Sequence, residues 1–377
     1  MVPRKLEGVI NQRLGKGKAV IVMGARQTGK TTLLHKLFSG DGNALWLNGD
    51  DADTHAMFDA GSARMLQTFI GNHKTVIVDE AQRIENIGIK LKLITDQMKD
   101  VQLVVTGSSS FELANKINEP LTGRKWEYML FPLSFGEMAE YHGAFEEMKL
   151  LNHRLVYGYY PEVVMHENEA ENRLKSIADS FLYKDVLHWE NIKKSDKLLM
   201  LLKALAFQVG QEVSYNELGK TIGLDKETVE KYIQLLEQSF VIFRLTSLSR
   251  NLRKELKKSR KIYFYDNGIR NALLSDFRPA NNRQDIGGLW ENFLISERKK
   301  QLHYNHLYVN THFWRTHDQQ EIDYIEERNG VLHAFEFKWN PKKKARLSKS
   351  FSNAYPNHSF KIINPENYIQ WLIGDDY

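Results

Sequence analysis

Residues 24–31 have the composition and spacing of a phosphate-binding loop, because they match G-x-x-x-x-G-K-[ST] at every fixed position. Apolar residues 19–23 predict a strand before the loop, and residues 33–38 predict a helix after it. In that setting successive backbone N–H groups point at a phosphate from the N-terminal end of a helix. The residues expected to bind a nucleotide are Gly24, Ala25, Arg26, Gln27, Thr28, Gly29, Lys30, Thr31 and Thr32.

The loop residues differ in the chemistry they offer a triphosphate. Gly24 and Gly29 let the backbone turn and approach the ligand without a Cβ clash. Lys30 is expected to reach the β- and γ-phosphates, and the Thr31 hydroxyl is suited to ligate Mg²⁺. Arg26 is expected to be a solvated or lid-facing side chain rather than a catalyst. An accidental match is the alternative to this interpretation, and it can be judged by whether a partner motif follows.

Such a partner is the carboxylate pair Asp79 and Glu80, which follows the apolar residues 75–78. A buried strand would bring Asp79 to Mg²⁺ through the metal's water shell, and Glu80 would polarise the attacking water as a general base. Alone, the pair would also fit a solvated strand end. After a phosphate-binding loop, it predicts hydrolysis of ATP with Mg²⁺, because phosphoryl transfer needs a metal and a group that orients water.

A third polar group follows the apolar residues 101–105, which predict another strand. Ser108 is the residue expected to sense the γ-phosphate, with Thr106 as the second choice and a plain Gly/Ser turn as the alternative. Strands that alternate with helices at this spacing predict an α/β fold with a parallel sheet, whose ligand lies beyond the carboxyl ends of the strands.

The composition is that of an ordinary globular protein with more than one domain: 377 residues, 42% hydrophobic and 26% charged. No apolar run is long enough to span a bilayer, and no secretory signal is expected at the start, so the protein is expected to be cytoplasmic without a membrane partner. The absence of Cys excludes disulfides and thiolate metal sites. A net charge of +5 is too small to indicate nucleic acid by itself.

A second group of reactive side chains lies near the end of the chain, where Asp323 and the pair Glu336 and Lys338 occupy two predicted strands. Asn329 and Gly330 between them predict a hairpin turn. Side-chain alternation places Glu336 and Lys338 on one face, opposite an apolar face. Two carboxylates and an ammonium would then lie together, as in a metal site, although a cross-strand surface pair is the simpler alternative.

The middle of the chain is predicted to be helical, with helices over residues 135–141, 146–156 and 174–189. A second set follows from residue 196, in which Ser214 has the position of a helix cap. Three helices followed by two strands predict a winged helix, whose wing at residues 250–261 carries seven Lys or Arg and one Glu. The run suits contact with a phosphate backbone, although such runs are usually solvated loops.

Several of these segments together resemble a family of bacterial and archaeal AAA+-type ATPases, in which an N-terminal ATPase domain joins a C-terminal region of uncertain function. The resemblance rests on residues 24–31, 79–80, 106–109, 121–124 and 131–137. It implies a helical lid on the ATPase core. It also implies that Arg124 acts as an arginine finger in a neighbouring protomer, and hence a homo-oligomer, although a local ion pair is nearly as well supported.

The C-terminal segment resembles the restriction-endonuclease-like, PD-(D/E)xK nuclease fold. That resemblance implies that Asp323 and Glu336 hold Mg²⁺ or Mn²⁺, that Lys338 acts on the attacking water, and that Glu291 adds a ligand from a helix. It also suggests that Arg315 contacts phosphate. A basic strip that could follow a DNA backbone comprises Lys342, Lys343, Lys344, Arg346 and Lys349.

The sequence as a whole predicts four segments and one principal function. The segments are an ATPase core at 1–131, a helical lid at 132–195, a winged helix at 196–265 and a nuclease-like α/β domain at 266–377. The expected protein binds and hydrolyses ATP and couples turnover to DNA binding, with metal-dependent DNA cleavage as a further expectation. The alternative is an ATP-gated switch for a protein partner, in which the nuclease-like domain is a catalytically idle scaffold.

Overall fold

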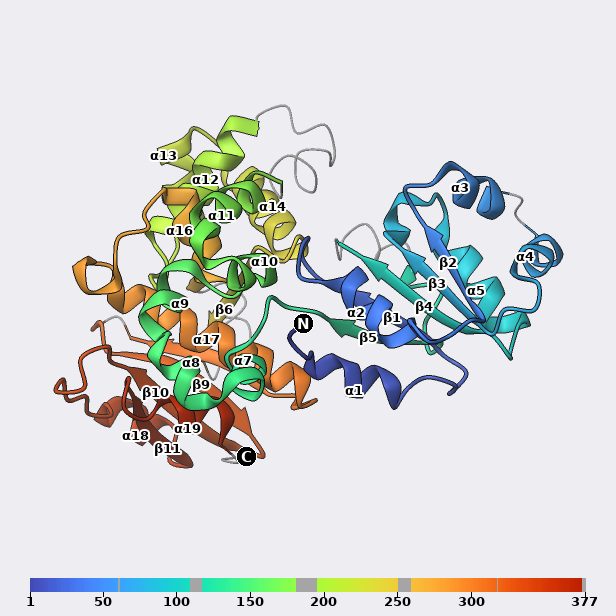
Figure 1. Cartoon of the computed structure of the whole chain (residues 1–377). Helices are drawn as coiled ribbons and strands as arrows, with labels where there is room; N and C mark the ends of the chain where they lie inside the picture. The colour runs from blue at the N-terminus through green and yellow to red at the C-terminus, as the bar shows by residue number, and fades with distance from the viewer. Residues whose placement is uncertain (60–61, 109–116, 181–194, 250–258, 317, 375–377) are drawn as a thin grey trace. The chain divides into compact units, whose positions relative to one another are not determined.

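The computed structural model describes the whole chain apart from residues 60–61, 109–116, 181–194, 250–258, 317 and 375–377. It contains two compact units, of which the first spans Met1–Pro132 and the second takes in nearly all of the remaining described chain. Each unit is built around its own sheet (Figure 1).

The described residues of the first unit form a parallel sheet of five strands in the order β2-β3-β4-β1-β5. These strands are β1 (Ala19–Met23), β2 (Ala44–Asn48), β3 (Thr75–Asp79), β4 (Gln102–Gly107) and β5 (Lys125–Met129). Because all the strands are parallel, their carboxyl ends meet at one edge, which is where parallel sheets bind ligands. The expected α/β fold with a parallel sheet is therefore confirmed.

Among the described helices of this unit, the first precedes β1 and the others connect the strands from β1 to β4, as a parallel sheet requires. They are α1 (Lys5–Asn11), α2 (Lys30–Phe38), α3 (Ala52–Asp59), α4 (Ala63–Ile70), the one-turn 3-10 helix η1 (Ala81–Arg83) and α5 (Ile87–Gln97). Strand β5 and helices α3 and α5 were not predicted from the sequence. Strand β5 alternates Lys and Glu with aromatic residues, and its pairing with β1 is what reveals it.

The second unit contains the remaining helices of the described chain (Figure 1). They are α7 (Phe135–His142), α8 (Ala144–Lys149), α9 (Leu151–Tyr157), α10 (Pro161–Met165), η2 (Glu167–Glu169), α11 (Ala170–Ser180), α12 (Ser195–Phe207), α13 (Tyr215–Ile222), α14 (Lys226–Gln238), α16 (Asn267–Leu274), η4 (Ala280–Asn282), α17 (Ile286–Tyr304), α18 (Lys349–Ala354) and α19 (Tyr368–Ile373). The predicted cap of α13 is confirmed, because Ser214 accepts a hydrogen bond from the Glu217 N–H.

The single helix predicted over 146–156 is wrong, since the chain breaks between α8 and α9 at Leu150. The break allows Arg154 Nε to donate to Glu147 Oε1 at 2.9 Å, with both side chains buried. In one continuous helix, seven residues would separate the two positions by about 10 Å along the axis. The buried ion pair and the interruption of the helix therefore go together.

A mixed sheet of six strands forms the core of the second unit, in the order β11-β10-β9-β8-β6-β7 over the described residues. Its strands are β6 (Ile242–Ser247), β7 (Arg260–Phe264), β8 (Asn310–Arg315), β9 (Glu321–Arg328), β10 (Val331–Phe337) and β11 (His358–Ile363). The expected hairpin joins β9 to β10 through Asn329 and Gly330, which both have positive φ. The two predicted wing strands, β6 and β7, belong to the same sheet because β6 pairs with β8.

Helices α7 to α11, predicted from the resemblance to be a lid, lie in the compact unit of this mixed sheet. Buried polar contacts fix them there. The Phe135 N–H donates to Glu297 at 2.7 Å, Lys300 donates to the Leu133 carbonyl at 3.0 Å, and the Tyr159 N–H donates to Asp266 at 2.6 Å. The predicted boundary after residue 131 nearly coincides with the division of the chain, whereas those at 195 and 265 fall inside one compact unit.

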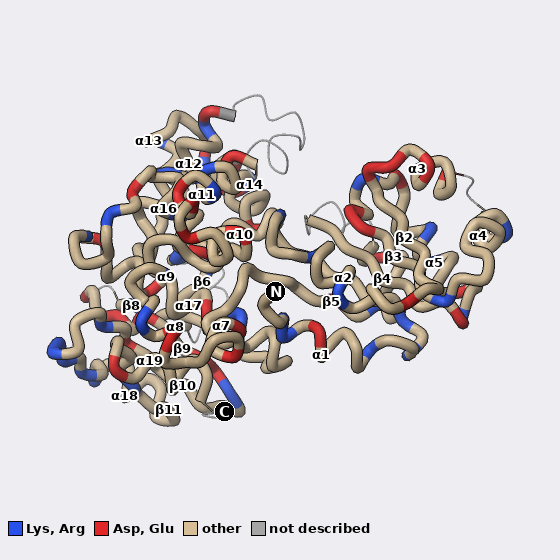
Figure 2. Tube along the Cα trace, in the orientation of Figure 1, with Lys and Arg blue, Asp and Glu red and all other residues tan. Residues whose placement is uncertain are grey.

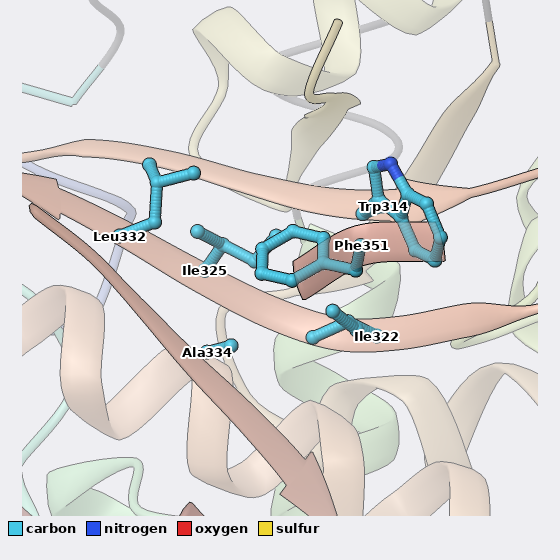
Figure 3. Packing of buried hydrophobic residues seen from close by; sticks show 6 residues of the cluster. All are labelled: Trp314, Ile322, Ile325, Leu332, Ala334 and Phe351. Atoms are coloured by element: carbon cyan, nitrogen blue, oxygen red, sulfur yellow. The ribbon is translucent and has the colours of Figure 1, made fainter. Parts of the chain in front are cut away.

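Apolar side chains from three neighbouring strands and α18 form one core cluster of the mixed sheet (Figure 3). Phe351 of α18 is fully buried and packs edge-on against Trp314 with ring centroids 5.2 Å apart. The other members are Ile322, Ile325, Leu332 and Ala334. This cluster anchors β9 and β10, the two strands that carry the second group of reactive side chains.

We expect the buried pair of Arg298 and Glu326 to be important for the stability of the second unit. Arg298 Nε donates to Glu326 Oε1 at 2.7 Å, and the two residues are 2% and 0% exposed. Glu326→Gln keeps the shape but replaces a buried carboxylate, which both Arg298 and Arg328 contact, by a neutral amide. The change should lower the free energy of unfolding by about 3 kcal/mol. Urea denaturation measures the loss. The control Glu327→Gln, at an exposed position on the same strand, should change it by less than about 0.5 kcal/mol; equal effects would contradict the prediction.

Candidate nucleotide site and a second acidic site

The loop between β1 and α2 folds into a closed turn around the ammonium of Lys30. Lys30 is 5% exposed, and its Nζ donates to the carbonyl oxygens of Gly24 and Ala25 at 2.9 Å each. Thr28 is buried and donates to the Ala25 carbonyl at 2.9 Å. Gly29 has φ +92° and precedes the first residue of α2, so the helix N-terminus opens directly from the loop.

Gly24 is required by a close backbone approach, because a Cβ on it would lie 2.2 Å from the Leu130 carbonyl oxygen. Arg4, which is 9% exposed, also holds the loop in place. The sequence did not predict a role for this residue at the nucleotide site. The Arg4 guanidinium donates to the Thr28 carbonyl at 2.7 Å and to the Phe131 carbonyl at 2.6 Å. The loop is therefore bound to the start of the chain and to the residues just after β5.

The predicted metal-binding groups of the loop and of β3 are in direct contact. The Thr31 hydroxyl donates to Asp79 Oδ2 at 2.7 Å, although 48 residues separate them. On its other oxygen, Oδ1, Asp79 accepts from the Thr106 hydroxyl and, at 3.1 Å, from the Glu80 N–H. These donors are neutral and fix the carboxylate, and its oxygens with the Thr31 hydroxyl form the set of hard donors that Mg²⁺ prefers.

Glu80 lies at the turn after β3 with φ +50°, a conformation that non-glycine residues seldom adopt. Its Oε2 accepts from the Ser108 hydroxyl at 3.1 Å and from the Gln82 amide. Gln82 also donates to Ser108 Oγ at 2.9 Å and is 3% exposed. Of the two residues considered as sensors, Ser108 therefore contacts Glu80 and Thr106 contacts Asp79. Gln82 was missed, because no motif spacing connects it to a residue on another strand.

Four other predicted residues lie at the edge of this site or away from it. Gln27, with φ +58°, and Thr32 are exposed, and Arg26 is half-buried. Arg124 Nε donates to Asp96 at 2.6 Å and lowers the pKa of that carboxyl. The structure thus shows the local ion pair that the sequence left open for Arg124, and action in a neighbouring protomer stays a prediction.

The C-terminal group is brought together on β9 and β10. Lys338 Nζ lies 2.6 Å from Glu336 Oε2 and 3.9 Å from Asp323 Oδ2, and Asp323 accepts from the Phe337 N–H at 2.8 Å. Burial and the neighbouring Asp323 raise the pKa of Glu336 from 4.5 to about 7. Although burial opposes it, the same carboxylates raise the pKa of Lys338. Lys338, which lies beside both carboxyl groups, is therefore strongly stabilised in its charged form.

Glu291, predicted as a helix-borne metal ligand, is engaged by two other side chains. It accepts from the Tyr263 hydroxyl at 2.6 Å and from Lys261 Nζ at 3.1 Å. Lys261 is 1% exposed and also lies 2.5 Å from Glu321. Burial raises the pKa of Glu291 to about 7, and Asp323 adds to the shift while Lys261 opposes it.

Among the described residues no group of three His, Asp or Glu side chains is arranged to hold a metal ion. The metal site expected from Glu291, Asp323 and Glu336 is therefore not supported here and stays a prediction. Ammonium groups of the chain lie against two of these carboxylates, Lys261 against Glu291 and Lys338 against Glu336. Arg315, which was expected to contact phosphate, forms an ion pair with Glu212 at 3.4 Å.

Basic residues follow one another along the loop before α18, where Figure 2 shows the Lys and Arg positions together. All five residues of the predicted strip, Lys342, Lys343, Lys344, Arg346 and Lys349, are exposed. The predicted basic wing lies mostly outside the described residues. Among the helices that the structure describes, none combines the length and apolarity needed to cross a membrane.

Comparison with known proteins divides the chain into three matched segments. Residues 16–139 match a family described as "AAA domain", residues 148–280 match a domain of unknown function, DUF8612, and residues 286–375 match another, DUF4143. The first match contains the loop, Asp79, Glu80 and Ser108, whose geometry and parallel sheet agree with it. The first unit has the AAA-type P-loop ATPase fold.

Relatives among curated proteins extend over most of the chain. An uncharacterised protein of Mycobacterium tuberculosis is 26% identical over 87% of this chain and 72% of its own length. An uncharacterised protein of Methanocaldococcus jannaschii is 24% identical over 97% of this chain and 87% of its own length. The similarity therefore includes both compact units.

Solved structures align with large parts of the chain at low sequence identity. A Walker-type ATPase of Pyrococcus abyssi aligns over 73% of this chain and 96% of its own, with 13% identity and a TM-score of 0.49. A Drosophila ORC structure bound to AT-rich DNA and Cdc6 aligns over 72% of this chain and 89% of its own, with 11% identity and a TM-score of 0.27.

The raised pKa of Glu336 predicts how stability depends on pH. Between pH 4.5 and about 7 this carboxyl holds a proton in the folded chain and releases it on unfolding, so the free energy of unfolding should fall as the pH rises through that window. Glu336→Gln should reduce this fall by about 2 kcal/mol between pH 5 and 8, measured by urea denaturation. The exposed control Glu366→Gln should leave the pH dependence unchanged. A wild-type curve that rose through this window would contradict the prediction.

Proposed function

We propose that the first unit binds ATP and hydrolyses it to ADP and inorganic phosphate. The observation that carries the proposal is the 2.7 Å hydrogen bond between Thr31 and Asp79, because it joins the phosphate-binding loop to the acidic end of β3. Neither motif would do this chemistry alone. Together they offer phosphate donors, metal ligands and, in Glu80, a base for water.

In the proposed reaction, the N–H groups at the start of α2 and the Lys30 ammonium bind the phosphates. In the structure the Lys30 ammonium donates to the carbonyls of Gly24 and Ala25. On binding ATP it would donate to phosphate oxygens instead. Thr31 and Asp79 would hold Mg²⁺, which when bound neutralises charge on the phosphate oxygens.

Glu80 would accept a proton from the attacking water. The water oxygen forms a bond to the γ-phosphorus as the bond from that phosphorus to the bridging oxygen breaks, and ADP departs with the electron pair. Orientation of the water by such a base contributes about 10²–10⁴-fold to the rate. The fixed direction of the Glu80 carboxylate is therefore part of the catalytic arrangement.

Lys30→Ala should abolish ATP turnover, because it removes the ammonium from the centre of the loop. The measurement is phosphate release with ATP and Mg²⁺. The matched control is Lys36→Ala on the same helix, whose ammonium pairs with Glu7 at 2.7 Å and lies outside the loop. We expect a loss of more than about 100-fold in the first variant and less than about twofold in the second. An unchanged rate in Lys30→Ala would refute the proposed site.

We also propose a second function, the binding of nucleic acid backbone by the second unit. It is supported by the exposed basic residues before α18, Lys342, Lys343, Lys344 and Arg346, which offer cations to a phosphate backbone. Metal-dependent cleavage by Asp323, Glu336 and Lys338 is a narrower proposal within it, as are the winged-helix assignment of 196–265 and the nuclease-like assignment of 266–377. The alternative remains an ATP-gated switch for a protein partner.

Replacing Lys342, Lys343 and Lys344 together by Gln should weaken DNA binding and lower its salt dependence. Three lost phosphate contacts would reduce the slope of log affinity against log salt by about 2–3. Fluorescence anisotropy with single-stranded and duplex DNA at several salt concentrations measures both quantities. The control replaces the exposed Lys16, Lys74 and Lys92 of the first unit by Gln, an equal change of charge.

The outcomes of this experiment separate the functions. Equal DNA affinity of the two triple variants would refute the role of the basic strip in DNA binding. Absence of DNA binding in the wild type would favour the ATP-gated switch for a protein partner. Nicking in Mg²⁺ or Mn²⁺ that Glu336→Ala removes would support a nuclease. Binding without nicking would support an idle scaffold.

A further inference from the structure

Gln82 is buried beside the proposed catalytic base, although no motif assigns it a role. It lies in η1, the single turn that follows Glu80, and its side chain is 3% exposed. A buried primary amide needs partners for two N–H donors. Here its Nε2 contacts Glu80 Oε2 and donates to Ser108 Oγ at 2.9 Å, so the amide lies between the ends of β3 and β4.

The contacts of Gln82 and Ser108 converge on one oxygen of Glu80. Ser108 Oγ donates to Glu80 Oε2 at 3.1 Å, and the Gln82 amide donates to the same oxygen. Neither of these contacts uses Oε1. A carboxylate that two donors hold by one oxygen presents the other oxygen in a fixed direction, which is what a base needs in order to take a proton from a positioned water.

The backbone at Glu80 does not by itself fix that direction. Glu80 has φ +50°, and its N–H donates to Asp79 Oδ1 at 3.1 Å and to the Thr106 hydroxyl at 3.3 Å. Its carbonyl accepts from the Arg83 N–H at 3.0 Å, and none of these contacts involves the Glu80 side chain. Glu80 precedes η1 rather than lying inside a helix or strand. The rotamer of its side chain is therefore set by neighbouring side chains, and the described contacts come from Gln82 and Ser108.

We propose that Gln82 is a positioning residue for ATP hydrolysis, holding Glu80 Oε2 so that Oε1 faces the attacking water, and linking Glu80 to Ser108. The inference rests on the proposed ATPase function. Ser108 lies at the end of the strand between those that carry the loop and Asp79. A γ-phosphate that drew the Ser108 hydroxyl toward itself would free one donor from Glu80, and the Gln82 amide would retain the carboxylate.

Gln82→Met is the sharpest test, because it keeps the length of the side chain and removes both donors. We expect kcat to fall by about tenfold or more, a part of the 10²–10⁴-fold that proton transfer supplies. The Kd of ATP should change by less than about twofold, since the amide of Gln82 contacts Glu80 and Ser108, which act after ATP has bound in the proposed reaction. The matched control is Gln67→Met, at an exposed position on α4, which should leave both quantities unchanged.

A double variant shows whether Gln82 and Ser108 hold Glu80 together or affect the rate independently. If Gln82 and Ser108 act on Glu80 as one unit, Gln82→Met with Ser108→Ala should be no more than about twofold slower than the slower single variant. Losses that multiply would overturn the link between the two residues. A merely structural role for Gln82 predicts a lower melting temperature with kcat and Kd both disturbed, or no change in kcat, and either result would overturn the positioning role.

The controls separate failure of this inference from failure of the proposed function. Wild-type turnover that is lost in Lys30→Ala and Glu80→Gln but retained in Gln82→Met would refute only the role of Gln82. A wild type that releases no phosphate above the Lys30→Ala background would refute the ATPase proposal itself. The quantities measured are steady-state phosphate release, and ATP binding by calorimetry with a non-hydrolysable analogue.

Discussion

The hydrogen bond between the Thr31 hydroxyl and the Asp79 carboxylate joins the two halves of the nucleotide site. It can form because the strands leading to these residues are parallel and end at the same edge of the sheet. Strand β4 lies between them, so Thr106 and Ser108 arrive beside Asp79 and Glu80. The strand order thus determines which polar groups can reach the phosphate end of a bound nucleotide.

The acidic groups of the second unit have a different electrostatic environment. Asp79 is held by hydroxyl and backbone donors, which are neutral. Glu336 instead lies beside Lys338, and Glu291 beside Lys261. Cations of the chain therefore supply the positive charge that a metal would otherwise bring, and a divalent ion would have to displace an ammonium group. This difference is why the nucleotide site is the better-supported site for Mg²⁺.

The sequence was informative where chemistry depends on residues close along the chain, and less so where it depends on packing. The phosphate-binding loop, the Asp79–Glu80 pair and the β9–β10 hairpin are each contiguous segments, and their local structure was predictable. Gln82 meets Ser108 across 26 residues, and Lys300 meets Leu133 across 167. Such contacts leave no periodicity in the sequence. The packing of α7 to α11 and the partner of Arg124 could therefore be known only from the folded chain.

Arg4 bears on how the first unit can be isolated. Its guanidinium bridges the carbonyls of Thr28 and Phe131, both inside the segment that matches the AAA domain, whereas that match begins only at residue 16. A fragment cut at the limits of the match would leave two buried carbonyl oxygens without their charged donor, at the point where the loop meets the exit from β5. Useful truncations therefore retain Arg4, the residue just before α1.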